Sequence, residues 1–272
     1  MALTITSAPS TGGYGATVTL TGLTTGSRDR WSLWRTTPDG VQTPVRGYGG
    51  DLIGVTATGD VTVTDDYEAP LGRPVAYYVR VWTSATPGSW IDATASWLTL
   101  AHPDALSVVL KDPSIPSRTT TVVVTTMPSW QRAARQAVHQ VRGRPRPVVL
   151  TDVRSARTGS VVLSTATHTE RQALTWLLES GHTLLAQWPP GWGEDDTYLQ
   201  VGSVGEDRLS EYAPQPDRGW TLELTEVDRP IGGLVGSAGR TWQTVRDGNA
   251  TWANLLTKYS TWLGVLTGVE GT

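Results

Sequence analysis

The sequence predicts a mainly β protein of two modules, followed by a tryptophan-rich tail. Short runs rich in Thr and Val alternate with Gly and Pro turn signals along most of the 272 residues, a pattern typical of β-sheet proteins. Only one stretch, 168–180, has a well-formed helical pattern. The length fits two domains better than one. The 13 Trp and 8 Tyr supply bulk for a core in a chain without Phe.

Residues 1–100 predict a β-sandwich. The segments 3–6, 16–20 and 60–64 alternate apolar and polar residues, as strands do when only one face is buried. Further strands are predicted at 31–34, 74–82 and 94–100, with a turn at Pro38-Asp-Gly40. About seven such strands are typical of an immunoglobulin-like or fibronectin-type-III-like module. In such a module Tyr77 and Tyr78 are expected to be core residues. The alternative for these aromatic residues is an exposed platform that binds carbohydrate.

The second module, residues 101–231, begins after a proline-rich linker. Prolines at 103, 113 and 116 place the domain boundary near Ala101. The segment 106–110 predicts an entry strand, and the β-branched run 119–125 predicts either another strand or an arm that contacts a partner. A β–α–β–β unit then extends from 158 to 227, with predicted strands at 158–164, 198–204 and 219–227.

The helix at 168–180 has clear signals at both ends. Thr167-His-Thr-Glu170 is a capping box, in which the Thr oxygen accepts an otherwise unbonded amide and the Glu reaches back. Gly181 ends the pattern. Between them an apolar stripe, formed by Ala173, Leu174, Leu177 and Leu178, predicts packing on a sheet.

Residues 128–157 form the most basic stretch of the chain. It contains Arg132, Arg135, Arg142, Arg144, Arg146, Arg154 and Arg157. Such a run indicates either a nucleic-acid contact or, as the second interpretation, a polar loop or a subunit contact inside an acidic assembly. Because neither interleaved aromatics nor a nucleic-acid motif accompanies it, we favour the second interpretation. A strand is predicted to begin at Pro147 and to reach Thr151.

The tail, residues 232–272, repeats a Thr-Trp pair every ten residues. The pairs begin at Thr241, Thr251 and Thr261. Ten residues is not a helical face repeat, so we expect short helical turns, each started by a Thr cap. Three tryptophans in a terminal segment indicate docking onto a partner or a neighbouring copy, or packing of the tail on its own domain.

No pattern in the sequence points to catalysis, a metal or a cofactor. The four His lack metal-ligand spacing, Cys is absent, and phosphate-loop and nucleophile-elbow motifs are missing. Glu194-Asp-Asp196 could hold calcium or supply acid/base carboxylates, and a cell-wall hydrolase that uses Glu194 or Asp195 stays an alternative. We favour a solvated acidic loop. We therefore expect a protein that is not an enzyme.

The bulk properties narrow the possible locations. A formal charge of −3 gives no general attraction to nucleic acid or anionic membrane. The first residues lack the basic and apolar regions of a secretory signal. No apolar run approaches the roughly 18 residues of a spanning helix. We expect a protein without a membrane span that is released into the cytoplasm.

Several segments resemble minor tail proteins of long-tailed phages of actinobacteria, in the distal-tail class. They are Thr158-Gly-Ser-Val-Val-Leu-Ser-Thr-Ala-Thr-His-Thr-Glu-Arg-Gln-Ala-Leu174, Leu184-Leu-Ala-Gln-Trp-Pro-Pro-Gly191, Trp220-Thr-Leu-Glu-Leu-Thr-Glu-Val-Asp-Arg-Pro230 and the Thr-Trp repeat. The resemblance implies a split β-barrel of tail-hub type with one helix. It also implies a hexameric ring that connects the tail tube to the distal tip or baseplate.

The resemblance further implies partners and a place in the virion tail, after assembly in the host cytoplasm. The partners are further copies of the chain, the tail tube protein, the tape measure protein and tail-tip hub proteins, with DNA passing through the channel without specific recognition. One departure is that the sandwich comes first here, whereas the ring domain comes first in better-known distal tail proteins.

On this interpretation, particular residues are expected at contacts with subunits or partners. They are Arg135, Arg142, Arg144, Trp188, Trp192, Trp242, Trp252 and Trp262. The strand 119–125 is a candidate for extending a neighbour's sheet. The alternative function is a carbohydrate-binding or host-adhesion module of the tail, with the sandwich and the loop 188–192 as the binding surface.

Overall fold

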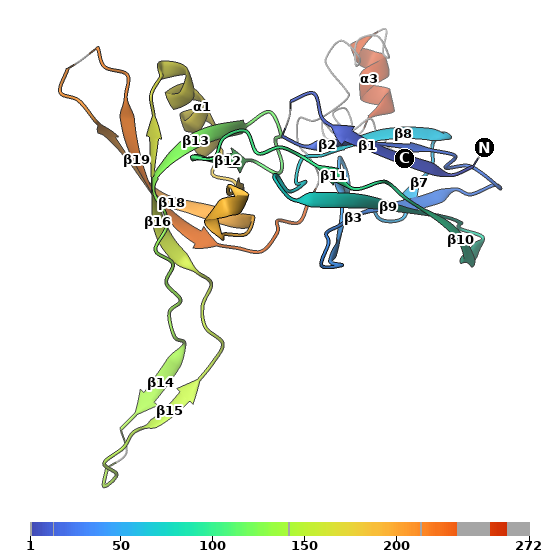
Figure 1. The fold of residues 1–272 in the computed structure, drawn as a ribbon. Coiled ribbons are helices and arrows are strands. Elements are labelled where there is room, and N and C mark those ends of the chain that lie inside the picture. The colour runs from blue at the N-terminus through green and yellow to red at the C-terminus, as the bar shows by residue number, and fades with distance from the viewer. Residues whose placement is uncertain (1, 13, 141, 213, 233–250, 260–272) are drawn as a thin grey trace. The chain divides into compact units, whose positions relative to one another are not determined.

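A computed structural model describes residues 2–12, 14–140, 142–212, 214–232 and 251–259 of the chain, and it is mainly β (Figure 1). The chain forms two compact units, Met1–His102 with Pro113–Ser117 and Ile231–Thr272, and Pro103–Asp112 with Arg118–Pro230. The first crossing between units falls beside the boundary expected near Ala101. The second unit is thus inserted into the first, because the chain returns at Ile231. There the Arg46 guanidinium donates a hydrogen bond to the carbonyl of Gly232.

The first unit contains two antiparallel sheets. The three-stranded sheet has the order β1 (Thr4–Pro9), β2 (Ala16–Thr21) and β8 (Val61–Asp66). The six-stranded sheet has the order β10 (Thr86–Thr94), β9 (Pro74–Thr83), β3 (Arg30–Thr36) and β4 (Gln42–Pro44), with β11 (Leu98–Thr99) paired to β9 and β7 (Val55–Thr56) paired to β3. A small ribbon pairs β5 (Arg46–Gly47) with β6 (Gly50–Asp51).

The alternating strands bury one face, as predicted. Val18 and Leu20 of β2 are fully buried, as are Val79 and Val81 of β9. Tyr77 is buried with them, so its assignment to the core is confirmed. Tyr78 points the other way, as the next residue in a strand must, and is only half-buried. The prediction that both tyrosines are core residues is therefore wrong for Tyr78.

A buried carboxylate joins elements of both sheets. Asp66, at the end of β8, accepts two 2.8 Å hydrogen bonds from the Arg35 guanidinium of β3. The hydroxyl of Tyr77 in β9 donates to the same carboxylate at 3.1 Å. Burial, together with the charge of Asp66, raises the pKa of Tyr77 well above its usual value. A second buried pair, Arg46 and Glu68, lies at 3.1 Å.

The last strands of the sandwich differ from the expectation. The predicted strand at 94–100 is reduced to the two residues of β11, whereas the nine-residue β10 precedes it. Pro87 and Gly88 mark a turn in the sequence, but here they fall at a register shift of the β9–β10 ladder. Proline and glycine are tolerated inside a strand at such irregularities.

The second unit is a closed six-stranded barrel. Its strands are β12 (Ser107–Lys111), β13 (Thr119–Thr126), β16 (Thr158–Thr165), β19 (Arg218–Glu226), β18 (Thr197–Arg208) and β17 (Leu184–Gln187), in this order, with β17 pairing back to β12. Apolar side chains fill the interior, among them Leu163, Leu199 and Leu222. They leave a cavity of only about 10 Å³, about the space of a single water. The barrel is a packed core and not a ligand pocket.

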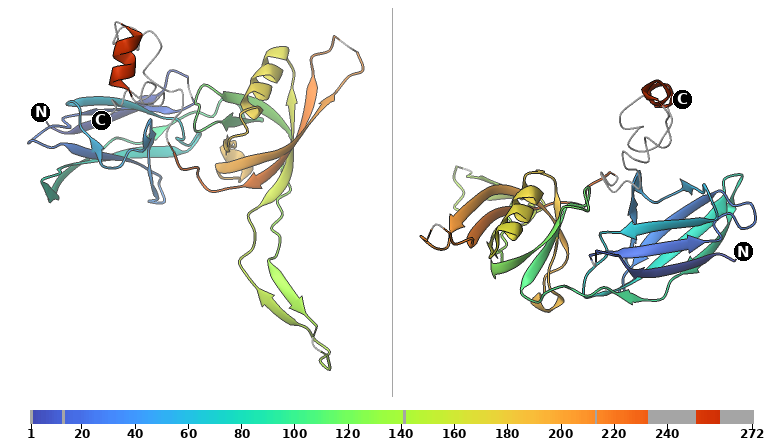
Figure 2. Two further views of the ribbon diagram at one scale, coloured as in Figure 1. Left: turned by 180° about the vertical axis from the view of Figure 1, so that it is seen from behind. Right: turned by 90° about the horizontal axis from the view of Figure 1, so that it is seen from above.

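The predicted helix is α1 (His168–Leu178), which packs on β13 and β16 (Figure 2). Thr167 accepts a hydrogen bond from the Glu170 amide at 3.2 Å, as the capping box predicts. The Glu170 carboxylate reaches back to the amide of Ala166, one residue before the cap. Leu174 and Leu177 are fully buried, and Gly181 follows with a positive φ of 63°.

Two expectations about the barrel strands need correction. Residues 119–125 were expected to be free to extend a neighbour's sheet, but β13 is hydrogen-bonded to β12 on one edge and to β16 on the other. The alternative interpretation of this segment, a strand, is confirmed, with residues 119–123 paired to β12 and residues 123–126 paired to β16. The strand β17 was not expected, because its four residues are all buried and show no alternation.

Of the three Thr-Trp repeats, only the second lies in the described part of the chain. It forms the short helix α3 (Trp252–Lys258), in which Thr251 caps the amide of Asn254 at 3.2 Å. This confirms the prediction of a Thr-capped helical turn at that repeat. Trp242 and Trp262 lie outside the described residues. Within those residues, no helix is both long and apolar enough to cross a membrane.

Candidate functional site

The basic stretch forms a long hairpin between β13 and β16, called here the arm (residues 131–158). Its strands β14 (Gln136–His139) and β15 (Val148–Thr151) pair with each other, from Gln136 opposite Thr151 to His139 opposite Val148. Figure 1 shows this ribbon extending from the end of β16. Every described residue from Gln131 to Arg154 is exposed. Only the Pro147–Thr151 half of this hairpin was predicted as strand.

Four backbone hydrogen bonds join the two segments of the arm between the bridge at its base and the hairpin β14–β15. Gln131 and Thr158 exchange two of them, at 2.8 and 2.9 Å. Beyond this pair, Ser155 donates to Ala133 at 3.1 Å and Asp152 donates to Arg135 at 2.8 Å. The hairpin β14–β15 is therefore a separate two-stranded sheet, with a few backbone hydrogen bonds between it and the isolated bridge at Gln131 and Thr158.

Arg157 anchors the base of the arm. Its guanidinium lies 4.9 Å from the Trp130 ring centroid and donates to the Glu226 carboxylate at 2.9 and 3.0 Å. These hydrogen bonds lower the pKa of Glu226 and raise that of Arg157. Glu194 lies 3.5 Å from the same guanidinium. The acidic loop considered as a calcium or catalytic site therefore contributes Glu194 to this anchor.

Arg132, near the base of the arm, also lies 3.9 Å from Glu226. The arginines farther along the arm differ from these two. Arg135, Arg142, Arg144, Arg146 and Arg154 form no ion pair with any residue that the structure describes. The arm holds seven of the 22 basic residues and one of the 25 acidic residues, so the rest of the chain carries 15 basic against 24 acidic residues. Positive charge is thus concentrated on the arm and negative charge elsewhere.

The arm also exposes apolar side chains. Val138 and Val149 face each other across the ladder with 51% and 45% of their surface exposed. Leu150 is 61% exposed and Val153 is 78% exposed. A two-stranded ribbon alone in water is marginally stable, and its open edges can pair with another chain. Arginines without ion-pair partners among the described residues, exposed apolar side chains and open strand edges therefore occur together on the arm.

The structure places the predicted contact residues in very different surroundings. Arg135, Arg142 and Arg144 all lie on the arm and are exposed. Trp188 is only 2% exposed and belongs to the barrel core, which corrects the expectation that it forms a contact surface. Its neighbour Trp192, at the end of the short 3-10 helix η1 (Pro190–Trp192), is partly buried against the same core. Trp252, by contrast, is 65% exposed on α3.

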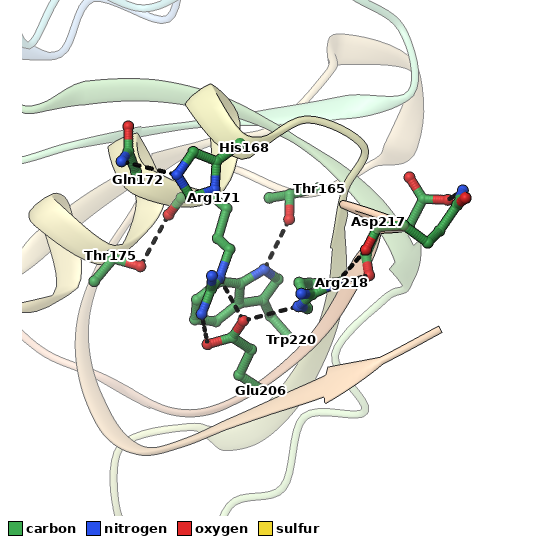
Figure 3. Close-up of polar contacts among 10 residues, drawn as sticks. Thr165, His168, Arg171, Gln172, Thr175, Glu206, Asp217, Arg218 and Trp220 are labelled. Carbon is green, nitrogen blue, oxygen red and sulfur yellow. Dashed lines mark hydrogen bonds and ion pairs between the residues drawn. The ribbon is translucent and has the colours of Figure 1, made fainter. Parts of the chain in front are cut away.

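A polar cluster holds α1 against the outer ends of β18 and β19 (Figure 3). Glu206 of β18 accepts from the Arg171 guanidinium at 2.6 Å and lies 3.3 Å from that of Arg218. Trp220 donates its indole N–H to the Thr165 hydroxyl at 3.0 Å. The Glu206 carboxylate is thus held between two guanidiniums.

The described residues contain no cluster of side chains suited to hold a metal ion. Among them, no three His, Asp or Glu residues are placed to hold one metal ion. The structure also contains a polar pair that the sequence did not reveal. The Nδ1 atom of His182 lies 2.8 Å from the buried carboxylate of Asp112. The two residues are 70 positions apart, so no local pattern could have shown their contact. His182 follows α1 and Asp112 follows β12.

No protein-family model matches this chain, and no curated protein matches its sequence. The arm is therefore the feature from which a function is inferred.

Proposed function

We propose that this protein is a structural subunit of a phage tail tip, in which copies assemble into a ring through the arm. The observation that carries the proposal is the exposed hairpin β14–β15, with five arginines that lack ion-pair partners among the described residues. The ring, of six subunits by the resemblance to distal tail proteins, connects the tail tube to the distal tip or baseplate. The protein acts as a connector and not as an enzyme.

A second copy of the chain is the partner that best suits the arm. Outside the arm the chain has an excess of acidic residues, so a neighbouring copy offers the complementary charge. When each arm contacts a different surface of the next copy, the interface is heterologous, and rotation can close it into a ring. The open edges of the ribbon can add to a sheet of the neighbour.

Strand order supports the finer assignments of fold. In the first unit, β1, β2 and β8 form one sheet, whereas β4, β3, β9 and β10 form the core of the other. This division into two sheets supports the proposed fibronectin-type-III-like variant of the immunoglobulin sandwich. In the second unit, a barrel with a single packed helix supports the split-barrel, tail-hub type.

The proposal includes the other components of a tail tip. The tail tube protein, the tape measure protein and hub proteins contact the ring, and DNA passes through its channel without being recognised. The protein lies in the tail of the virion and assembles in the host cytoplasm. Trp252, exposed on α3, is a contact with a partner or a neighbouring copy, and we propose the same for Trp242 and Trp262.

Charge reversal on the arm tests this proposal. The variant carries Arg135→Glu, Arg142→Glu and Arg144→Glu, and its assembly is followed by analytical ultracentrifugation over a range of concentrations. Because like charges at an interface cost several kcal/mol, we expect the dissociation constant of the assembly to rise by at least about 100-fold. Arg208→Glu, at an exposed position of the same barrel, is the control and leaves assembly unchanged.

Two results would overturn the role of the arm. One is a triple variant that assembles as the wild type does. The other is a wild-type protein that stays monomeric and binds duplex DNA, with an affinity that falls steeply with salt. The second result would assign the arm to nucleic acid.

A further inference from the structure

The outer face of the six-stranded sheet carries aromatic rings where a solvated face is ordinarily polar. Along β9, Tyr77, Val79 and Val81 point inward, so Tyr78, Arg80 and Trp82 point outward. The ladders place Trp34 of β3 beside Tyr78, and Trp90 of β10 beside Trp82. Four aromatic side chains therefore form two cross-strand pairs on one face of the sheet.

The two pairs stand at opposite ends of a narrow strip. The rings of Trp34 and Tyr78 are 5.5 Å apart at an angle of 43°. Tyr78 and Trp82 are four positions apart in β9, which corresponds to about 13 Å along the strand. Trp90 remains 48% exposed although it lies in a paired strand. The strip is thus long and open rather than a closed pocket.

A charge-balanced polar pair lies between the aromatic pairs. Arg80 donates to Asp92 at 2.9 and 3.2 Å, and the two residues are opposite each other in the ladder. The same guanidinium donates to the Tyr78 hydroxyl at 2.7 Å and lies 4.7 Å from the centroid of Trp90. The polar groups are therefore held in place, while the side chains of Arg80 and Asp92 stay 36% and 34% exposed.

We infer that this strip, formed by Trp34, Tyr78, Arg80, Trp82, Trp90 and Asp92, is a binding site for a neutral oligosaccharide. The C–H face of a sugar ring is apolar and packs on an aromatic face, whereas its hydroxyls both donate and accept hydrogen bonds. Asp92 can accept and Arg80 can donate, and aromatic walls with few fixed polar groups are typical of ligand sites. Asp92 neutralises Arg80, and Arg30, which the ladder places beside Trp82, donates to the neutral oxygens of Gly54 and Thr56.

The shape of the strip favours a chain of sugars over a protein partner. Hot-spot aromatics of protein interfaces lie in well-packed pockets at the centre of a patch. Here the rings are spread along one sheet face, with the polar pair midway. This site is also distinct from the loop 188–192, whose Trp188 is buried. It lies in the first unit and does not depend on assembly through the arm.

Ligand titration of the full-length protein tests the inference. The probes are hexasaccharides of glucose, of galactose and of N-acetylglucosamine, with oligogalacturonate as a charged comparison, followed by tryptophan fluorescence and calorimetry. We expect at least one neutral probe to bind, with little dependence on salt. Trp90→Ala and Trp34→Ala should each weaken that binding by about tenfold, the loss expected for one aromatic contact.

Trp176→Ala is the matched control, since Trp176 is also about half exposed (46%) but lies on α1 of the other unit. It should leave binding unchanged, and unfolding curves should show that both strip variants remain folded. Failure of all three neutral probes to bind would overturn the inference. So would binding that survives both strip substitutions, or binding of oligogalacturonate alone.

Discussion

Asp66 is the residue on which the sandwich depends most. Its carboxylate is 1% exposed and joins Arg35 and Tyr77 across the two sheets. Removing one partner of a buried ion pair leaves the other charge without compensation. Asp66→Ala should therefore lower the free energy of unfolding by about 3–5 kcal/mol, measured by urea denaturation.

The exposed pair of Arg80 and Asp92 provides the comparison. Its geometry is similar, at 2.9 Å, but both side chains are about one-third exposed. Exposed pairs contribute about 0–1 kcal/mol because water and salt screen them, so Asp92→Ala should cost no more than that. Equal losses for the two variants would contradict the dominant role assigned to burial.

Glu226 makes the base of the arm sensitive to pH. The hydrogen bonds from Arg157 lower the pKa of Glu226 in the folded protein. A lowered pKa stabilises the fold above the unfolded-state value of about 4.3, and that contribution is lost as the pH falls through the folded value. We therefore expect Glu226→Gln to reduce amide protection at Gln131 and Thr158 at pH 7.

Below the folded-state pKa the same substitution should have almost no effect, because Glu226 is then protonated and neutral in both proteins. Hydrogen exchange, normalised for intrinsic rates at each pH, makes the comparison. A difference between wild type and variant that persists unchanged in acid would show that the charge of Glu226 does not hold the base of the arm.

Among the elements, strands with a clear alternation could be predicted and strands without it could not. The periodicity of β2 and β8 and the caps of α1 are local signals, and the structure contains these elements where they were expected. The short buried run of β17 has no alternation of apolar and polar residues. In β10, Pro87 and Gly88 indicate a turn, so the strand was not predicted. The arm was recognised by its charge, but β14 has no hydrophobic pattern that distinguishes a ribbon from a loop.

The loop after β17 shows why exposure is difficult to predict from composition. Trp188 is followed by two prolines and a glycine, which indicate a surface turn. The chain does turn there, but only after the indole has entered the barrel core. Whether a particular ring points inward depends on long-range pairing of β17 with β12 and β18.

Substitution of Trp188 tests its place in the core. Trp188→Ala should lower the free energy of unfolding by about 3–5 kcal/mol, because it leaves a cavity among the barrel leucines. Trp176→Ala, on the exposed side of α1, should cost less than about 1 kcal/mol. A Trp188 variant as stable as the wild type, but defective in assembly, would restore Trp188 to an interface.

For the whole molecule, the main feature is the insertion of the barrel into the sandwich chain. The chain leaves the first unit after His102, returns to it briefly at Pro113–Ser117, and returns again at Ile231, where Arg46 donates a hydrogen bond to the carbonyl of Gly232. This return could not be predicted, since the two residues are 186 positions apart.

The distribution of charge is also a property of the whole molecule. The formal net charge is −3, but seven arginines lie on the arm and 24 acidic residues lie in the rest of the chain. This asymmetry favours association between unlike surfaces of identical copies. Such head-to-tail contacts produce rings when they close and filaments when they do not.

The mass and shape of the purified protein, by light scattering and negative-stain imaging, test the central proposal most directly. The comparison is a variant in which residues 137–150 are replaced by Asn-Gly, which joins the paired residues Gln136 and Thr151 through a tight turn. We predict closed rings of one order with a central channel for the wild type, and monomers for the variant. A monomeric wild type, or rings that persist without the arm, would contradict assembly through this hairpin.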